Sequence, residues 1–124
     1  MIAGAHTLIH ADDPETTRAF FRDVLGFPSV DAGGGWLIFA LPPAELGIHP
    51  VEGPDQLTGR TELYLMCHDI TRTTEELEAK GVQFTAPVSE ERFGLLTRFK
   101  VPGAGEAWLY EPRHPSPLAA FGPG

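Results

Sequence analysis

The sequence predicts an α+β fold in which two βαβββ modules, about residues 4–50 and 60–112, pair into a mixed sheet that encloses one cleft. Two landmarks recur in both halves of the chain. Asp13 and Asp69, 56 positions apart, stand where a helix should begin, and Gly26 and Gly81, 55 positions apart, stand where it should end. A four-stranded sheet with a single helix leaves one face bare, so two such units must cover each other.

Length and charge limit what the chain can do. With 124 residues and 42% apolar content, it is expected to fold as a single domain over residues 1–124. Its formal charge of -8 argues against nucleic acid and anionic lipid as partners. No apolar run approaches the roughly 20 residues of a membrane helix. No signal peptide is visible, so a cytoplasmic location is expected.

In the first module, the helix carries the clearest signals. An apolar stretch at 5–11 predicts a strand before it. The next residues offer an Asp cap, a proline for the first turn and acids at the positive end of the helix dipole. Apolar side chains at helical spacing predict a helix from about Pro14 to Leu25, and Gly26 supplies a left-handed stop.

An extended stretch from Phe27, a turn at Gly33–Gly35 and then two strands are expected after this helix. Trp36–Leu41 is rich in strand-forming residues, and it should end at Pro42, because proline cannot donate to a sheet ladder. Glu45–His49 is predicted as a short strand. Pro50–Gly59, which is rich in proline and glycine, is predicted to link the modules.

The second module repeats this order. A strand is predicted at 61–68, followed by a short helix capped by Asp69 or Thr71 and stopped by Gly81. An extended stretch at 82–85 and strands at 93–101 and 106–111 should follow, with a turn at 102–105 between the last two. The proline-rich tail from Pro112 is predicted to lie irregularly on the surface.

Several spaced segments resemble the vicinal oxygen chelate superfamily, which contains glyoxalases, bleomycin resistance proteins and extradiol dioxygenases. Phe20–Phe27 is similar to the recurrent FY-x-x-x-LGF segment, and His6–Asp12 is similar to the first strand of the glyoxalase I type. Asp69–Val82 resembles the second-module pattern, and Leu109–Pro112 resembles the usual end. The resemblance covers about residues 4–112 and implies the paired-module fold.

The resemblance also implies where a metal would bind. Metal-using members place one ligand on the first and one on the last strand of each module. These positions fall on His6, His49 (or Glu45 in another register), Glu62 and Trp108. An indole cannot coordinate a metal, so the resemblance implies an incomplete site and no cofactor. A divalent metal held by His6, His49 and Glu62 alone, as in a two-His-one-carboxylate site, stays an alternative.

Strand alternation then predicts which other side chains share the cleft. The predicted ligand-binding residues are His6, Leu8, His10, Trp36, Phe39, His49, Glu62, Tyr64, Met66, Trp108 and Tyr110. A register shifted by one residue would instead turn Glu62 to water, and His6 and both tryptophans also fit a plain core role. Such an aromatic wall suits a flat or hydrophobic small molecule.

Three functions remain open at this stage. The first is a metal-free protein that binds a hydrophobic or aromatic small molecule. The second is a metal-dependent lyase, isomerase or ring-cleaving dioxygenase that uses His6, His49 and Glu62. The third is a metal-free enzyme in which His6 or His10 works with Glu62 as acid and base. In each case a homodimer is expected, since a partner can cover an open sheet edge and an apolar cleft wall.

Overall fold

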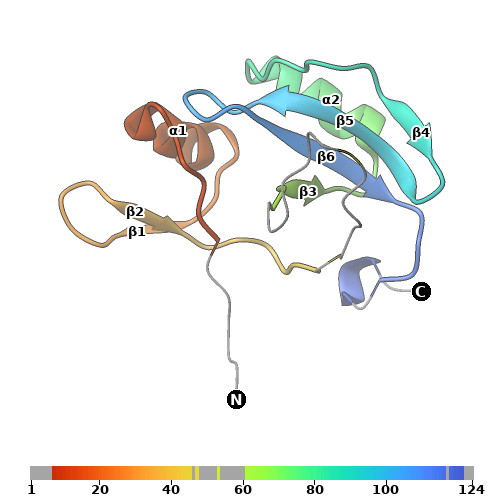
Figure 1. Ribbon diagram of the computed structural model, residues 1–124, viewed down its shortest axis with the longest axis horizontal. Coiled ribbons are helices and arrows are strands. Elements are labelled where there is room, and N and C mark those ends of the chain that lie inside the picture. The colour runs from red at the N-terminus through yellow and green to blue at the C-terminus, as the bar shows by residue number, and fades with distance from the viewer. Residues whose placement is uncertain (1–6, 46, 48–52, 54–60, 117, 122–124) are drawn as a thin grey trace.

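The computed structural model describes residues 7–45, 47, 53, 61–116 and 118–121. It is an α+β fold with two sheets, as the sequence predicts (Figure 1). An antiparallel pair is formed by β1 (Ser29–Asp31) and β2 (Leu37–Phe39). A four-stranded sheet has the order β3-β6-β5-β4 and is formed by β3 (Tyr64–Met66), β4 (Ser89–Glu91), β5 (Gly94–Lys100) and β6 (Glu106–Pro112).

The first helix begins where the sequence predicts and changes from an α-helix to a π-helix halfway along. Asp13 caps α1 (Pro14–Ala19), since its carboxylate accepts hydrogen bonds from the backbone N–H and the hydroxyl of Thr16 at 3.3 and 2.6 Å. Phe20–Val24 continues the helix in π-helical form. The N–H of Leu25 accordingly donates to the carbonyl of Phe20, five residues back, at 3.1 Å. Gly26 then stops the helix at φ 72°.

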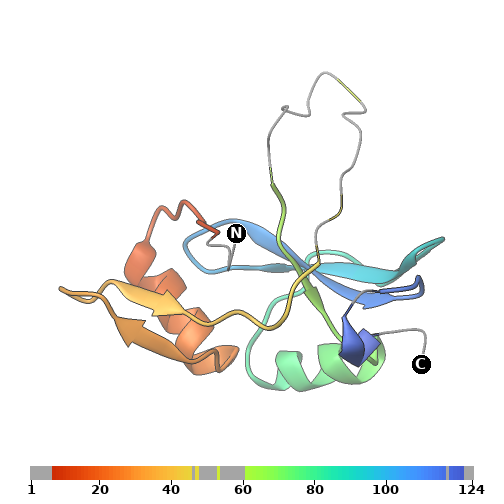
Figure 2. The same cartoon turned by 90° about the horizontal axis from the view of Figure 1, so that it is seen from below.

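The second module is complete and its sheet has two different faces. Helix α2 (Ile70–Ala79), capped by Asp69, lies along one face of the four-stranded sheet (Figure 2). The side chains of alternate strand residues face α2 and contribute to the core, with Phe99 fully buried; they include Leu65, Leu95, Phe99, Ala107 and Leu109. The other residues of the same strands, among them Tyr64 and Trp108, therefore point to the opposite face.

The edges of this sheet also differ. At one edge, β4 is three residues long and carries Glu90 and Glu91, both of them exposed. At the other edge, β3 carries Tyr64, Leu65 and Met66, and among the described residues it pairs only with β6, in parallel. The acidic side chains of β4 therefore oppose pairing of this edge with a further strand, whereas β3 carries no charged side chain.

The two modules meet where the turn between β5 and β6 touches the start of α1. The carbonyl of Gly103 accepts hydrogen bonds from the N–H groups of Asp12 and Asp13, at 2.7 and 3.2 Å. The hydroxyl of Thr17 donates to the carbonyl of Pro102 at 2.6 Å. Beneath this contact, the rings of Phe20 and Phe99 have centroids 6.3 Å apart, so polar and apolar contacts join the modules.

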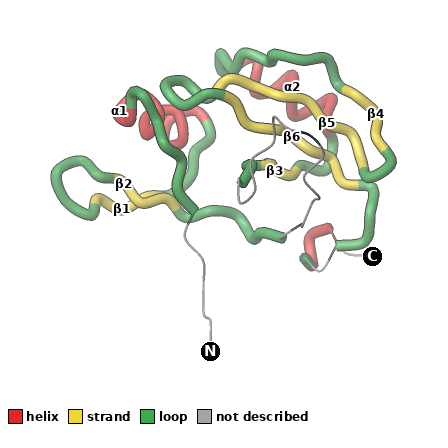
Figure 3. Tube along the Cα trace, viewed as in Figure 1, coloured by secondary structure: helices red, strands yellow, loops and turns green. Residues whose placement is uncertain are grey.

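Some of the expected strands differ from those observed. The expectation of a strand at 5–11 is wrong for its described part, because Thr7–Ala11 is loop (Figure 3). Within the described part of the chain this backbone pairs with no strand, and the hydrogen bonds to Gly103 come from Asp12 and Asp13, just after it. The strands predicted at 36–41 and 61–68 shorten to β2 and β3, and β4 was not anticipated. Most of Glu45–His49 and of the Pro50–Gly59 linker lies outside the described residues.

Gly103 offers a test of the contact between the modules. A Cβ at this position would lie 2.6 Å from the carbonyl oxygen of Asp13 and 2.8 Å from the hydroxyl of Thr17, whereas a Cβ on Gly105 would meet nothing within 4 Å. Both glycines have positive φ, 82° and 77°, so Gly105→Ala controls for backbone strain. We expect Gly103→Ala to lower the unfolding free energy by about 1–3 kcal/mol more than Gly105→Ala, measured by urea denaturation. Equal losses would contradict this contact.

Candidate functional site

A groove of about 660 Å³ opens where the segment before α1 faces the ends of three strands of the large sheet. One wall is Thr7–His10, and the other includes Glu62, Arg98 and Trp108. Volumes of 300–1,000 Å³ are usual for small-molecule sites. The groove therefore has the size of a ligand site and draws residues from both modules.

Three side chains stand in a row across the uncovered face of the sheet and lead into this groove. Trp108 on β6 is flanked by Tyr64 on β3 and by Arg98 on β5, because both are its direct partners in the sheet register. The rings of Tyr64 and Trp108 are stacked, with centroids 5.3 Å apart and planes 5° apart. The guanidinium carbon of Arg98 lies 5.2 Å from the Trp108 ring centroid. The row thus combines a phenol, an indole and a cation.

The outer end of the row is polar. The hydroxyl of Tyr64 donates to a carboxylate oxygen of Glu62 at 3.1 Å. Both side chains come from the segment that forms β3 or leads into it, and both are partly open to solvent. Since Glu62, Tyr64 and Met66 alternate along this segment, they belong to the face that carries Trp108.

The far end of the same face is closed by the chain itself. Tyr110 is 8% exposed, and its ring contacts the His114 ring with centroids 5.8 Å apart. The Glu45 carboxylate accepts a hydrogen bond from Ser116 at 2.6 Å and lies 3.6 Å from a ring nitrogen of His114. Burial, together with the negative charge of Glu45, raises the pKa of the Tyr110 phenol. The C-terminal tail therefore limits the open part of the face to the end near Trp108.

The predicted site residues fall into four sets. Leu8, His10, Glu62 and Trp108 line the groove. Tyr64, Met66 and Tyr110 lie on the same sheet face as Trp108 and extend away from the groove. Trp36 and Phe39 lie elsewhere, Trp36 beneath the guanidinium of Arg18 and Phe39 against Phe21. Two further residues, His6 and His49, lie outside the described residues.

Arg98 is the residue that sequence reasoning missed. It lines the groove and touches Trp108, yet nothing in its local sequence marks it. The predicted turn at 102–105 could have found it, because counting back from that turn places residue 98 or 99 opposite Trp108. The structure settles the register on Arg98.

The described residues do not by themselves provide a metal site. Across 7–45, 47, 53, 61–116 and 118–121, no three His, Cys, Asp or Glu side chains are grouped closely enough to hold an ion. At the last-strand position, Trp108 offers only an indole N–H, which is a donor. The groups present at this point fit a metal poorly and fit an aromatic contact well.

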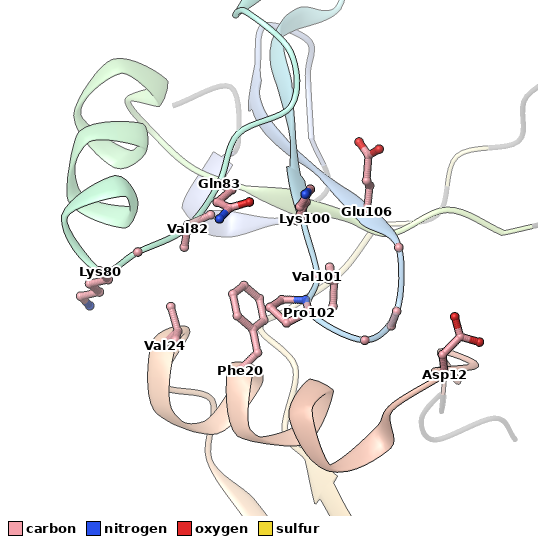
Figure 4. A pocket seen from close by; sticks show the side chains of 14 residues that line it. Asp12, Phe20, Val24, Lys80, Val82, Gln83, Lys100, Val101, Pro102 and Glu106 are labelled. Atoms are coloured by element: carbon pink, nitrogen blue, oxygen red, sulfur yellow. The ribbon is translucent and has the colours of Figure 1, made fainter.

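A second groove of about 660 Å³ lies between the first helix and the turn that joins β5 to β6 (Figure 4). Phe20 and Val24 form one side, and Val82, Val101 and Pro102 form the other. Phe20, Val82 and Val101 are buried core residues, so this groove is largely the seam between the modules. We therefore assign the candidate site to the groove beside Trp108.

No helix in the described part of the chain is long and apolar enough to cross a membrane. No curated protein sequence matches the chain.

Solved structures with the same fold span nearly the whole chain. A glyoxalase/bleomycin resistance protein/dioxygenase superfamily member from Sphaerobacter thermophilus is 26% identical, with a TM-score of 0.60 over 89% of this chain and 98% of that one. A lactoylglutathione lyase from Agrobacterium tumefaciens is 18% identical, with a TM-score of 0.62 over 88% and 92%. An antibiotic-binding protein from a Streptomyces species is 22% identical, with a TM-score of 0.59 over 90% and 99%.

The family model of this superfamily matches residues 4–112, which is most of the chain. The segments that resemble the superfamily and the complete second module lie within this range. The chain therefore belongs to the Glyoxalase/Bleomycin resistance protein/Dioxygenase superfamily.

Proposed function

We propose that this protein binds a hydrophobic or aromatic small molecule in the groove beside Trp108, without a complete metal site. The observation that carries the proposal is the place of Trp108. Its indole stands on the last strand of the second module, stacked against Tyr64 and beneath Arg98, at the edge of a groove of ligand size. A metal ligand at this position would need a lone pair that an indole does not offer.

The chemistry of the groove suits such a ligand. Leu8 and Ile9 are 62% and 41% exposed, and together with Trp108 they offer apolar surface that a bound molecule would cover. His10, Glu62 and Arg98 supply a few polar groups that can fix its orientation. Apolar walls with a few placed polar groups are the usual make-up of small-molecule sites. Aromatic ligands also gain from edge or offset contacts with indole and phenol rings.

The alternative is a metal-dependent lyase, isomerase or dioxygenase that uses His6, His49 and Glu62. The fold itself admits both activities, because a lyase and an antibiotic-binding protein share it with this chain. Two contacts favour the metal-free proposal. Glu62 accepts the hydroxyl of Tyr64, and Trp108 stands where the resemblance to metal-using members places the fourth ligand. A metal-free enzyme with His10 and Glu62 as its acid–base pair would use the same groove. Ligand binding alone already explains the size and the lining of this groove.

We also propose that the protein is a homodimer. Apolar side chains are exposed on the first module, where Val30 is 68% and Leu41 43% exposed. A two-stranded sheet such as β1–β2 is also marginal without a further packing partner. A second copy of the chain would cover these surfaces.

The ligand proposal can be tested through the two indole N–H groups of the protein. We expect 2-naphthol to shift the NMR signal of the Trp108 indole N–H and to leave that of Trp36 in place, because Trp36 lies outside the groove. By isothermal titration calorimetry, Trp108→Leu should weaken binding about 3- to 10-fold through lost aromatic contact, and Trp36→Phe should bind as the wild type does. A shift confined to Trp36, or an unchanged affinity in Trp108→Leu, would place the site elsewhere.

The metal-dependent alternative has its own test. As-purified protein should hold less than about half an equivalent of transition metal by elemental analysis, because one ligand position is Trp108. Trp108→Glu should restore that ligand, so Ni(II) should raise the melting temperature of this variant. Trp108→Ala is the matched control, since it removes the ring without adding a ligand. Stoichiometric Fe, Ni, Zn or Mn that is lost in Glu62→Gln would establish the enzyme instead.

The dimer proposal predicts a single species of twice the chain mass in sedimentation velocity at tens of micromolar, as expected for a micromolar or tighter dimer. Val30→Asp places a charge on the exposed apolar surface of β1 and should shift the equilibrium toward monomer. Val88→Asp, at an exposed site beside β4, is the control and should leave the mass unchanged. A wild-type protein that sediments only as a monomer would rule the dimer out.

A further inference from the structure

Two arginines of the chain lie over tryptophan rings, and one of the two faces the groove. Arg18 lies 5.0 Å from the centroid of Trp36, and Arg98 lies 5.2 Å from the centroid of Trp108. Stacking uses the face of a guanidinium and leaves its five N–H donors free in the plane. Only the Arg98–Trp108 pair belongs to the groove lining. Arg98 therefore presents guanidinium donors at the wall of the groove that would hold the proposed ligand.

These donors are not used within the described part of the protein. The acceptor nearest to the Arg98 guanidinium is Glu106, whose carboxylate oxygen lies 3.9 Å from Nε, beyond hydrogen-bond range. That same oxygen of Glu106 accepts the hydroxyl of Thr85 at 2.6 Å. Arg98 thus forms an ion pair with Glu106, but its side chain makes no hydrogen bond with any residue among 7–45, 47, 53, 61–116 and 118–121.

We propose that Arg98 binds an anionic oxygen group of the ligand, so that the groove selects planar aromatic acids, with a carboxylate as the best partner. This inference rests on the proposed function, because it names the ligand class of the same groove. The planar fork of a guanidinium matches the two oxygens of a carboxylate and forms two parallel hydrogen bonds. The edge of the Trp108 indole, whose two faces adjoin Tyr64 and Arg98, would contact the aromatic body of the same molecule.

Two carboxylates of the groove lining lie near Arg98: Glu106 on β6, with an oxygen 3.9 Å from Nε, and Glu62. The Glu106 contact is beyond hydrogen-bond range, so the donors of Arg98 remain available to a ligand carboxylate. Glu62 belongs to the segment of β3, two strands away from Arg98 on β5, and neighbouring strands are about 4.8 Å apart. That separation is comparable with the Debye length of about 8 Å at physiological ionic strength. The net charge of -8 acts over longer distances and is screened in the same way. The binding free energy of a carboxylate placed against Arg98 therefore depends mainly on its direct contact with the guanidinium.

The experiment compares three naphthalene probes that differ in one substituent: 2-naphthoate, 2-naphthol and 2-naphthylmethylammonium. Affinities are taken from the shift of the Trp108 indole N–H signal. We expect the wild-type protein to bind 2-naphthoate at least about 10-fold more tightly than the ammonium probe, because a charge-assisted pair forms with one and repulsion acts on the other. Raising the salt concentration should narrow this preference.

Arg98→Gln should weaken 2-naphthoate binding about 10-fold or more and change 2-naphthol binding by less than about 3-fold. Arg98→Lys keeps the charge and loses the fork, so it should fall between wild type and Arg98→Gln. Arg18→Gln is the matched control, since Arg18 also stacks on a tryptophan but lies outside the groove lining. It should bind all three probes as wild type does.

The outcomes separate the two proposals. If 2-naphthol binds but 2-naphthoate shows no preference, or if Arg98→Gln weakens all three probes equally, the selection by Arg98 is overturned and the binding site stands. If no probe shifts Trp108, the proposed function falls and the inference falls with it. Melting temperatures of the variants close to that of wild type exclude unfolding as the cause of any loss.

Discussion

The contact between the turn that joins β5 to β6 and the start of α1 organises this protein. The carbonyl of Gly103 accepts two backbone N–H groups at the entry to α1, and the hydroxyl of Thr17 reaches the neighbouring carbonyl. These bonds fix the chain just after the segment Thr7–Ala11, which therefore runs past the ends of the large sheet. One wall of the groove is that segment, and the other wall is the sheet. Without this contact the two walls would not face each other.

The chemistry of the site then follows from the register between β5 and β6. Their antiparallel pairing sets Arg98 opposite Trp108, while the parallel pairing of β3 sets Tyr64 on the other side. A cation, an indole and a phenol are thereby placed in one row, although they come from distant parts of the sequence. The opposite face of the same strands is filled by Phe99 and its neighbours beneath α2. One sheet thus serves as core on one side and as recognition surface on the other.

The sequence predicts features that depend on local chemistry, and it misses those that depend on partners. Asp13 as cap and Gly26 as stop were predictable, since both act within one turn of the helix. The apolar stretch at 5–11 predicted a strand, but a strand also needs a neighbour to pair with. Arg98 escaped notice because the predicted turn fixes the register only to within one residue, and a slip of one residue reverses the face. Aromatic strand residues such as Phe39 likewise carry no signal of which side they will face.

The unequal edges of the large sheet bear on how copies of this chain can assemble. When an edge strand pairs with the same strand of a second copy, the two-fold contact occupies both edges and no further copy can add there. A sheet with two open edges, in contrast, can add further copies at each end. Here the carboxylates of Glu90 and Glu91 oppose addition at β4, and β3 carries no charge that would do so. Growth of the sheet is thus permitted in one direction only. Any association through its strands would end at a closed pair, and a fibre would require the acidic edge to be neutralised first.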